Sequence, residues 1–315
     1  MNAMRLIGKK CVCVAVIAAW AVIAGATQPD REKIVRGSLR IGGLDRTWEL
    51  FLPSSPGPYP LVIVLHGSGA KGAIMRSFMG FNDLAEQNGF LALFPDSIGP
   101  YWNDGRSDNN SPSYRAGVDD VEFLTRLLGH VVAEYHGDPA RVYIAGFSNG
   151  GMMALRLGLA IPGKVAAVAS VSGTLPKPLA LRVARVPVPL LLIHGTEDRT
   201  VPWGGGKLVR GKMNRGEVLS VLDTLLFWAW NNGCAGSAGV SPMPDLDSRD
   251  GTRAFRMFFE CDDPVRETTL IAIQGGGHHW PGIGRSLPEG KAGKVSLDVS
   301  ATDLIWEFFS RHRPR

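Results

Sequence analysis

The 315-residue sequence has little excess charge of either sign. It contains 34 lysine and arginine residues against 29 aspartate and glutamate residues, a formal net charge of +5. Three of the basic residues and none of the acidic ones lie within residues 1–26, so the remainder carries 31 against 29, a net charge of +2. Proteins that bind nucleic acid or an anionic membrane through charge show a strong basic excess. The composition therefore predicts neither as a partner.

The sequence also has no apolar run of the roughly 20 residues that a membrane-spanning helix needs. Its most apolar stretch, Cys11 to Ala24, follows three basic residues and ends in an Ala-x-Ala pattern at 24–26. This pattern is typical of a secretory signal with its cleavage site. We expect residues 1–26 to be a signal peptide and residues 27–315 to be secreted or periplasmic. A permanent membrane anchor formed by the same stretch is the alternative.

Cysteine is scarce too: removal of the leader leaves only Cys234 and Cys261. Two cysteines in an exported chain favour one disulfide. It would tie the end of a helix expected over 218–231 to a strand expected over 253–259. Two unpaired buried thiols are the alternative. The sequence shows no internal repeat, no Ser/Thr-rich linker to a binding module and no insertion large enough for a lid domain.

Apolar runs alternate with helical patterns along the rest of the chain. We expect strands at 47–52, 61–65, 91–94, 141–145, 165–171, 190–193 and 268–273. The apolar period over 118–134 predicts a helix, and Ser300 with Asp303 is typical of the start of a last one. The alternation predicts a single α/β domain over 27–315, with a mostly parallel sheet and helices on both faces.

A Gly-x-Ser-x-Gly sequence, residues 146–150, follows one of these strands and precedes a helix. A serine on such a sharp turn exposes its hydroxyl to a substrate carbonyl. The flanking glycines avoid side-chain collisions in the turn. Ser148 is therefore the candidate nucleophile, with a plain glycine-rich turn as the alternative.

Two further polar segments follow predicted strands: His194 to Asp198, and Gly275 to Pro281. The carboxyl ends of parallel strands meet at one edge of a sheet, where active sites are built. Asp198 is the candidate acid, with Glu197 as its alternative. The candidate base is one of two adjacent histidines, His278 or His279. The order serine, acid, histidine is that of α/β-hydrolases.

The negative charge of a tetrahedral intermediate requires N–H donors. We expect one from the backbone of Asn149, directly after the nucleophile, and another from Ser68 in the loop after strand 61–65. His66, at the start of that loop, is more simply explained as a residue that shapes the loop than as a catalytic one.

Aromatic residues accompany each candidate segment. Trp102, Trp203 and Trp280 either stack against a substrate or pack the walls of the site. The second histidine, His279, is a further candidate for the substrate cleft. The long loops 97–117 and 281–299 leave the same sheet edge and are expected to wall the cleft. We expect no metal ion: the acidic run 245–251 lacks the closing acid of a calcium loop, and adjacent histidines on an extended chain point in opposite directions.

These segments together resemble secreted α/β-hydrolase esterases related to poly(3-hydroxybutyrate) depolymerases and to feruloyl and acetylxylan esterases. The matching segments are 65–67, 118–124, 138–153, 194–203 and 275–282, within a resemblance that runs from about residue 36 to 310. The resemblance implies an α/β-hydrolase fold without a large lid domain, no cofactor, and His278 as the catalytic histidine. His279 stands where threonine is common in the family.

The expected function is that of a serine esterase acting on hydroxyalkanoate oligomers or polyester, or on feruloyl or acetyl esters. Ser148, His278 and Asp198 would act through an acyl-enzyme. One alternative is a serine peptidase of the prolyl-oligopeptidase type, although no gating domain is visible. The other is a non-catalytic binding protein on a hydrolase scaffold. The oligomeric state is not predicted.

Overall fold

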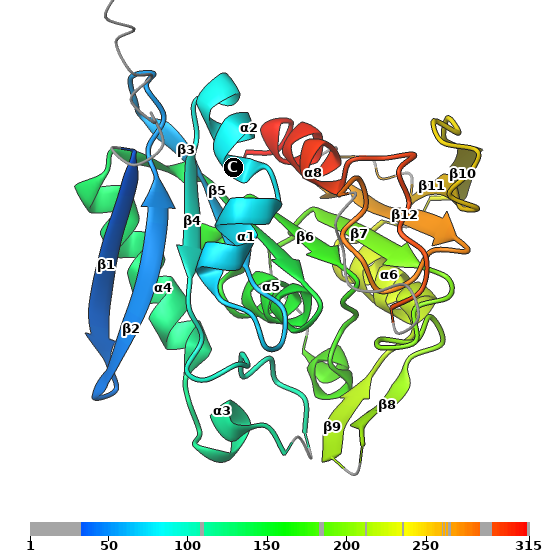
Figure 1. The fold of residues 1–315 in the computed structure, drawn as a ribbon, viewed down its shortest axis with the longest axis horizontal. Coiled ribbons are helices and arrows are strands. Elements are labelled where there is room, and N and C mark those ends of the chain that lie inside the picture. Colours follow the sequence, from blue (N-terminus) through cyan, green and yellow to red (C-terminus); the bar gives the residue numbers. More distant parts are fainter. Residues whose placement is uncertain are drawn as a thin grey trace, which may run out of the picture.

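The computed structural model covers most of the chain after the predicted leader (Figure 1). The described residues are 33–107, 110–182, 186–211, 213–234, 236–259, 261, 263, 266–283 and 292–313. The predicted signal segment 1–26 and the middle of the predicted loop 281–299 lie outside them.

One large mixed sheet organises the described residues. Its strands lie in the order β1 (Ile34–Ile41), β2 (Leu44–Phe51), β4 (Leu91–Pro95), β3 (Tyr59–Leu65), β5 (Gly137–Phe147), β6 (Ala167–Val171), β7 (Leu190–Gly195), β12 (Thr268–Gln274), β11 (Arg253–Phe259) and β10 (Ala238–Pro242). From β4 to β12 neighbouring strands are parallel, while the two outer strands on each side are antiparallel. The prediction of a mostly parallel sheet is confirmed.

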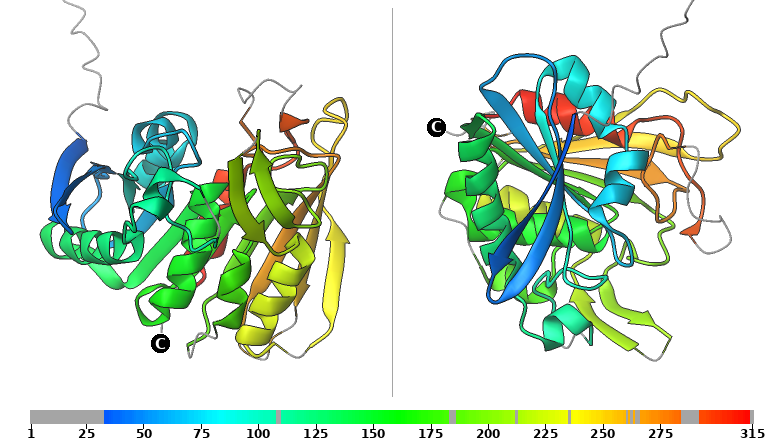
Figure 2. Two further views of the ribbon diagram at one scale, coloured as in Figure 1. Left: turned by 90° about the horizontal axis from the view of Figure 1, so that it is seen from below. Right: turned by 60° about the vertical axis from the view of Figure 1, so that its left-hand side comes forward.

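Alternation of side chains along the central strands produces two separate apolar layers. In β3, Leu61 and Ile63 join one core cluster, and Val62 and Val64 join the other. The helices that cover the first cluster are α4 (Asp120–Glu134), α5 (Asn149–Ala160) and α6 (Val221–Asn231). The helices that cover the second cluster are α1 (Gly72–Phe78), α2 (Phe81–Asn88) and α8 (Ala301–Ser310). Figure 2 shows helices on both faces of the sheet. Burial on both faces explains why these strands are apolar throughout.

Several short elements lie at the edge of the sheet that is formed by the carboxyl ends of the parallel strands. They are the helix α3 (Pro112–Arg115), the short 3-10 helix η2 (Lys177–Leu181), and the hairpin of β8 (Gly206–Arg210) and β9 (Met213–Val218). The helix expected over 218–231 begins instead at Val221, because β9 extends to Val218 and the Ser220 side chain caps the helix by accepting the Asp223 N–H. The last helix begins as expected, with Ser300 accepting the Asp303 N–H.

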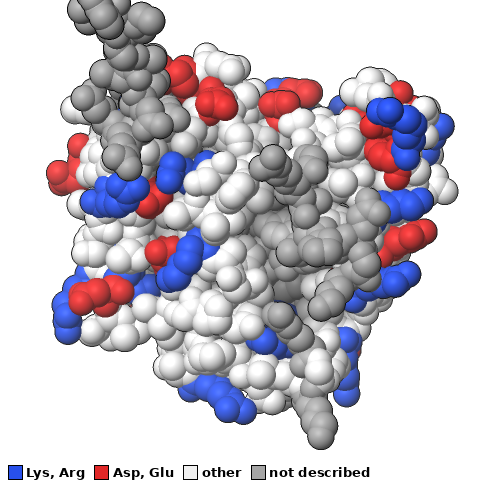
Figure 3. All heavy atoms as spheres, in the orientation of Figure 1, with Lys and Arg blue, Asp and Glu red and all other residues white. Residues whose placement is uncertain are grey.

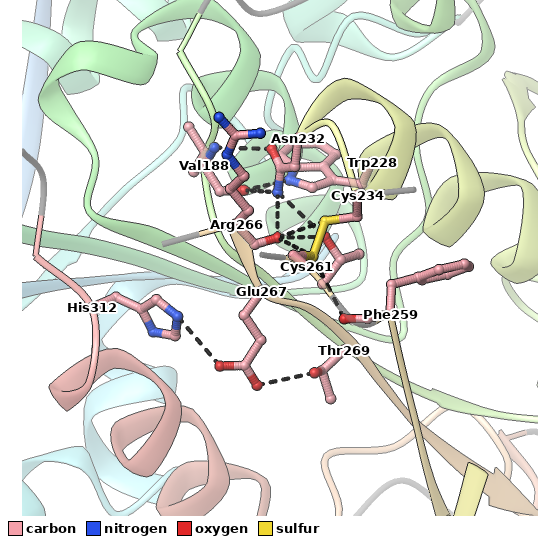
Figure 4. The surroundings of a disulfide bond; sticks show 11 residues. Val188, Trp228, Asn232, Cys234, Phe259, Cys261, Arg266, Glu267, Thr269 and His312 are labelled. Atoms are coloured by element: carbon pink, nitrogen blue, oxygen red, sulfur yellow. Dashed lines mark hydrogen bonds and ion pairs between the residues drawn. A yellow bond between two sulfur atoms is a disulfide. The ribbon is translucent and has the colours of Figure 1, made fainter. Parts of the chain in front are cut away.

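The opposite edge, at the amino ends of β7 and β12, holds a disulfide between Cys234 and Cys261 (Figure 4). It joins the segment after α6 to the segment after β11, as the two cysteines led us to expect. No helix among the described residues has the length and apolarity to cross a membrane. On the face shown in Figure 3, acidic and basic side chains are interspersed along the rim, and much of the described surface between them carries no charged side chain.

Candidate active site

Ser148 lies on a strained turn between β5 and α5. Its φ of 54° falls in the left-handed region, which costs a residue with a side chain about 1–3 kcal/mol. Glycine is required two positions before Ser148 and two positions after it. A Cβ on Gly146 would overlap the Gly150 carbonyl, and one on Gly150 would overlap the carbonyls of Leu65 and His66. The turn therefore presses closely against the end of β3.

Ser148, His278 and Asp198 form a continuous chain of hydrogen bonds. Asp198 Oδ2 lies 2.7 Å from His278 Nδ1, and His278 Nε2 lies 3.0 Å from Ser148 Oγ. An ionised carboxylate only accepts hydrogen bonds, so Nδ1 carries the imidazole proton and Nε2 accepts from the serine hydroxyl. All three residues are buried, with exposed fractions of 7% or less. His278 thus contacts Ser148, which lies 130 positions earlier in the sequence, and Asp198, which lies 80 positions earlier.

The loop after β7 holds the Asp198 carboxylate from its other side. Asp198 Oδ1 accepts the backbone N–H groups of Thr200 and Val201, each at 2.8 Å. His194 closes the same loop, because its Nε2 donates to the Val201 carbonyl at 2.8 Å and lies 3.4 Å from Asp198 Oδ2. The carboxylate therefore has partners for both oxygens, and its orientation toward His278 is determined.

Burial and hydrogen bonding act in opposite directions on these groups. Burial raises the pKa of Asp198, but the hydrogen bond with His278, the electrostatic interactions with the His278 and His194 rings and the Val201 N–H outweigh it, leaving the pKa below its usual value. For His194, burial dominates and lowers the pKa, despite the nearby Asp198 carboxylate and the Val201 carbonyl. At neutral pH the site therefore contains an ionised Asp198 beside a neutral His194.

The two segments expected to supply oxyanion donors both lie close to Ser148. Asn149 is the first residue of α5, so its backbone N–H belongs to the unpaired first turn of the helix. The loop that contains Ser68 approaches from β3: a Cβ on Gly67 would lie 3.5 Å from the Ser148 Cβ. Ser68 itself is exposed.

The His66 ring is fully buried, and its hydrogen bonds within the described part of the chain go to backbone groups. Its Nδ1 donates to the Gly67 carbonyl at 2.9 Å, and its Nε2 accepts the Ser97 N–H at 3.1 Å. Burial lowers the pKa of His66, so the ring is neutral. These contacts fit a residue that shapes the loop.

Of the tryptophans considered for substrate stacking, two are buried. Trp102 is 0% exposed and donates its indole N–H to the His66 carbonyl at 2.9 Å. Trp280 is 3% exposed and donates to Thr302 Oγ1 at 3.0 Å. Neither offers a ring face to a ligand, which corrects the stacking hypothesis for both. Trp203 is partly exposed, and its ring lies edge-on to that of His194.

The alternative acid and base have other surroundings. His279 is 4% exposed and donates from Nε2 to the Gly293 carbonyl at 2.8 Å. Glu197 is exposed and lines a separate polar pocket of about 500 Å³, together with Thr196, Ser248, Gly251, Thr252, Arg253, Gln274 and Gly275. The structure therefore favours Asp198 and His278 as partners of Ser148.

No group of three histidine, cysteine, aspartate or glutamate side chains in the described part of the chain is arranged to hold a metal ion. The carboxylates of the acidic run 245–251 have other partners. Asp245 pairs with Arg253 and Asp247 with Arg249, while Asp250 accepts the N–H groups of Thr252 and Leu297.

Sequence reasoning missed a buried polar network beside the nucleophile. Asp104 and Arg106, in the loop after β4, form an ion pair with N–O 2.7 Å, and Asp104 also contacts the Asn149 side chain. No spacing rule marks these residues, because the partners lie 45 positions apart.

A family model described as phospholipase/carboxylesterase matches residues 53–215, just over half of the chain. The matched region contains Ser148 and Asp198 and ends before His278. The chain belongs to the phospholipase/carboxylesterase family.

Relatives with curated names agree with this assignment. A putative esterase, NocK, from Nocardia uniformis subsp. tsuyamanensis is 29% identical over 91% of this chain and 83% of its own length. A poly(3-hydroxybutyrate) depolymerase from Ralstonia pickettii is 31% identical over 58% of this chain, and the match spans only 41% of that protein. The solved structure of an acetyl xylan esterase from Aspergillus awamori superposes with a TM-score of 0.60 over 88% of this chain and 99% of its own, at 14% identity.

The fold is therefore that of an α/β-hydrolase, and the protein is an enzyme that hydrolyses carboxylic esters. The resemblance to esterases and poly(3-hydroxybutyrate) depolymerases drawn from the sequence motifs is confirmed.

Proposed function

We propose that this protein is an exported serine esterase with Ser148 as nucleophile, His278 as general base and Asp198 as the residue that orients His278. The observation that carries the proposal is the chain of hydrogen bonds at 3.0 and 2.7 Å that links the three side chains. A serine hydroxyl is a poor nucleophile unless a neighbouring base accepts its proton as the new bond forms.

The reaction follows from this geometry. Ser148 Oγ attacks the ester carbonyl while His278 Nε2 takes its proton, and the resulting oxyanion accepts the backbone N–H groups of Asn149 and Ser68. The C–O bond to the alcohol then breaks, and the alcohol leaves with the proton from His278. Water then attacks the acyl carbonyl while His278 takes its proton, the bond from the acyl carbon to Ser148 Oγ breaks, and Ser148 Oγ regains a proton from His278 as the acid leaves.

We propose short hydroxyalkanoate oligomers or feruloyl and acetyl esters as substrates. The names of the relatives support this class, since they include a poly(3-hydroxybutyrate) depolymerase, a feruloyl esterase and an acetylxylan esterase. The predicted leader and the Cys234–Cys261 disulfide support export, because disulfides persist in oxidising compartments. Initial rates on feruloyl, acetyl and 3-hydroxybutyryl esters would rank the substrates.

The nucleophile is tested with two matched serine variants. Ser172 also follows a parallel strand, is 1% exposed and has a φ of 51°, but its Oγ donates to the His279 carbonyl at 3.1 Å. We expect Ser148→Ala to lower kcat on p-nitrophenyl butyrate by a factor on the order of 10³ or more and to abolish labelling by a fluorophosphonate probe. Ser172→Ala should retain both.

The same assay distinguishes the alternatives. Wild-type rates in Ser148→Ala would refute the nucleophile assignment. Wild-type protein that cleaves aminoacyl amides but not esters would be a peptidase. Wild-type protein that neither hydrolyses esters nor labels would be a binding protein on a hydrolase scaffold.

A further inference from the structure

The side chain of Asn149 is fully buried and is bound to the loop after β4. Its Oδ1 accepts the Trp102 N–H at 2.8 Å, and its Nδ2 donates to the Trp102 carbonyl at 3.1 Å. Nδ2 also donates to Asp104 Oδ2 at 2.5 Å. The carboxamide therefore pairs with both backbone groups of Trp102 and has every strong hydrogen-bonding direction used except one lone pair.

The segment that Asn149 holds is in turn bound to the loop that contains Ser68. Trp102 Nε1 donates to the His66 carbonyl at 2.9 Å, and the Pro100 carbonyl accepts the Gly69 N–H at 2.8 Å. The two bonds lie on either side of Ser68 in the sequence. A continuous connection therefore runs from the residue after the nucleophile, through residues 100–102, to the loop 66–69.

We propose that the Asn149 side chain is a positioning residue that fixes the distance between the two halves of the oxyanion hole. The inference rests on the proposed function, in which the two halves are the backbone N–H groups of Asn149 and Ser68. One half belongs to α5 and the other to the loop after β3, and no covalent link shorter than 81 residues joins them. The hydrogen bonds of the Asn149 carboxamide to Trp102 connect α5 to that loop through residues 100–102.

Burial makes this connection stiff. Asn149, Trp102 and Asp104 are each 0% exposed, and Arg106, at 5%, balances the Asp104 charge. Hydrogen bonds in such surroundings are strong, and leaving a buried donor or acceptor unpaired is costly. A donor displaced by about 1 Å from the developing oxyanion lowers the rate by about 10²-fold.

The chain contains a matched control. Asn232, 1% exposed, makes the same pair of bonds with one residue's backbone: its Oδ1 accepts the Val188 N–H at 3.1 Å and its Nδ2 donates to the Val188 carbonyl at 2.9 Å. It lies near the disulfide (Figure 4), bound to Val188 just before the amino end of β7, whereas Ser148 follows the carboxyl end of β5. Asn149→Leu and Asn232→Leu therefore remove equivalent contacts at different places.

The test measures kcat and KM on p-nitrophenyl butyrate, the inhibition constant of butane-1-boronic acid, and Tm for both variants. The boronic acid forms a tetrahedral adduct with the serine and so mimics the transition state. For Asn149→Leu we expect kcat to fall about 10²-fold with KM changed less than about 3-fold, and boronic acid affinity to fall in parallel with kcat. Asn232→Leu should lower Tm but leave kcat and the inhibition constant within about 2-fold of wild type.

A second variant keeps the test decisive if Asn149→Leu fails to fold. Trp102→Phe retains a buried ring and removes only the bond to the His66 carbonyl, and we expect about a 10-fold loss of kcat and of boronic acid affinity. Wild-type values in folded Asn149→Leu, or in Trp102→Phe if the former does not fold, overturn the inference while the proposed function stands. A wild-type protein with no esterase activity and no labelling overturns the proposed function instead.

Discussion

Two buried asparagines make equivalent bonds at opposite ends of the central sheet, and their surroundings differ. At the disulfide end, Asn232 lies beside Cys234, and its carboxamide bonds to the amino ends of β7 and β12. At the active-site end, Asn149 adjoins a serine held at a φ of 54°, and its own backbone N–H starts a helix. The disulfide end is cross-linked, whereas the end that carries Ser148 contains a residue with a positive φ and the first turn of a helix.

The difference shows how one kind of contact serves two purposes. At the disulfide end the polar bonds stabilise the junction of strands and helix. At the end that carries Ser148, under the proposed function, they hold the backbone N–H groups that would donate to the oxyanion. Changes at the first end should therefore affect the free energy of unfolding, and changes at the second should affect kcat.

The largest effect is expected from Asp198→Asn at the active-site end. An amide facing His278 Nδ1 can donate to it and so favour the wrong imidazole tautomer, which lowers kcat by about 10³–10⁴-fold. The Oδ1 bonds to Thr200 and Val201 survive, so Tm should change by at most about 4 °C. Kinetics on p-nitrophenyl butyrate with a thermal melt checks both. The neighbouring Glu197→Gln is the control and should retain activity; a loss there instead would reverse the choice of acid.

A smaller effect on a different quantity is expected from removing the disulfide. Cys234→Ser combined with Cys261→Ser opens a loop with a sequence separation of 27 residues, which should lower the free energy of unfolding by about 3–4 kcal/mol. Urea denaturation measures this loss, and kcat at 25 °C should stay at the wild-type value. If the variant remains folded but loses kcat, the idea that the disulfide end affects stability and not catalysis is wrong.

The smallest effect is expected from Glu267→Gln, also at the disulfide end (Figure 4). Burial raises the pKa of Glu267, but His312, Arg311 and Thr269 more than offset it and lower the pKa to about 2. A carboxyl whose pKa is depressed on folding stabilises the protein above its usual pKa near 4.5, and this contribution is lost as pH falls toward 2. At about 1.36 kcal/mol per unit, the contribution is about 3 kcal/mol at most.

The pH dependence separates this charge effect from simple loss of packing. Urea denaturation of wild type and Glu267→Gln should show the full difference at pH 7 and a shrinking one between pH 4.5 and pH 3. A difference that stays constant over this range would show that the carboxylate charge does not matter there.

Much of the fold was predictable because its causes are local. The apolar runs at 61–65 and 190–193 are strands buried on both faces, and Ser300 begins the last helix by capping it. Residues near Ser148 were harder to assign. Trp102 was a plausible stacking surface from its place in the chain, but its indole N–H bonds to His66, 36 positions earlier, and the ring is buried.

The sequence by itself determined the order of strands and helices, the glycines that the turn at Ser148 requires, and the residue types available for catalysis. These follow from side-chain alternation and backbone sterics within a few residues. Only the tertiary structure decided which histidine faces Ser148, which acid bonds to that histidine, and that Asn149 binds the loop at 102–104. Such choices depend on where strands far apart in sequence end in space, because hydrogen bonds and burial act over a few ångströms whatever the distance along the chain.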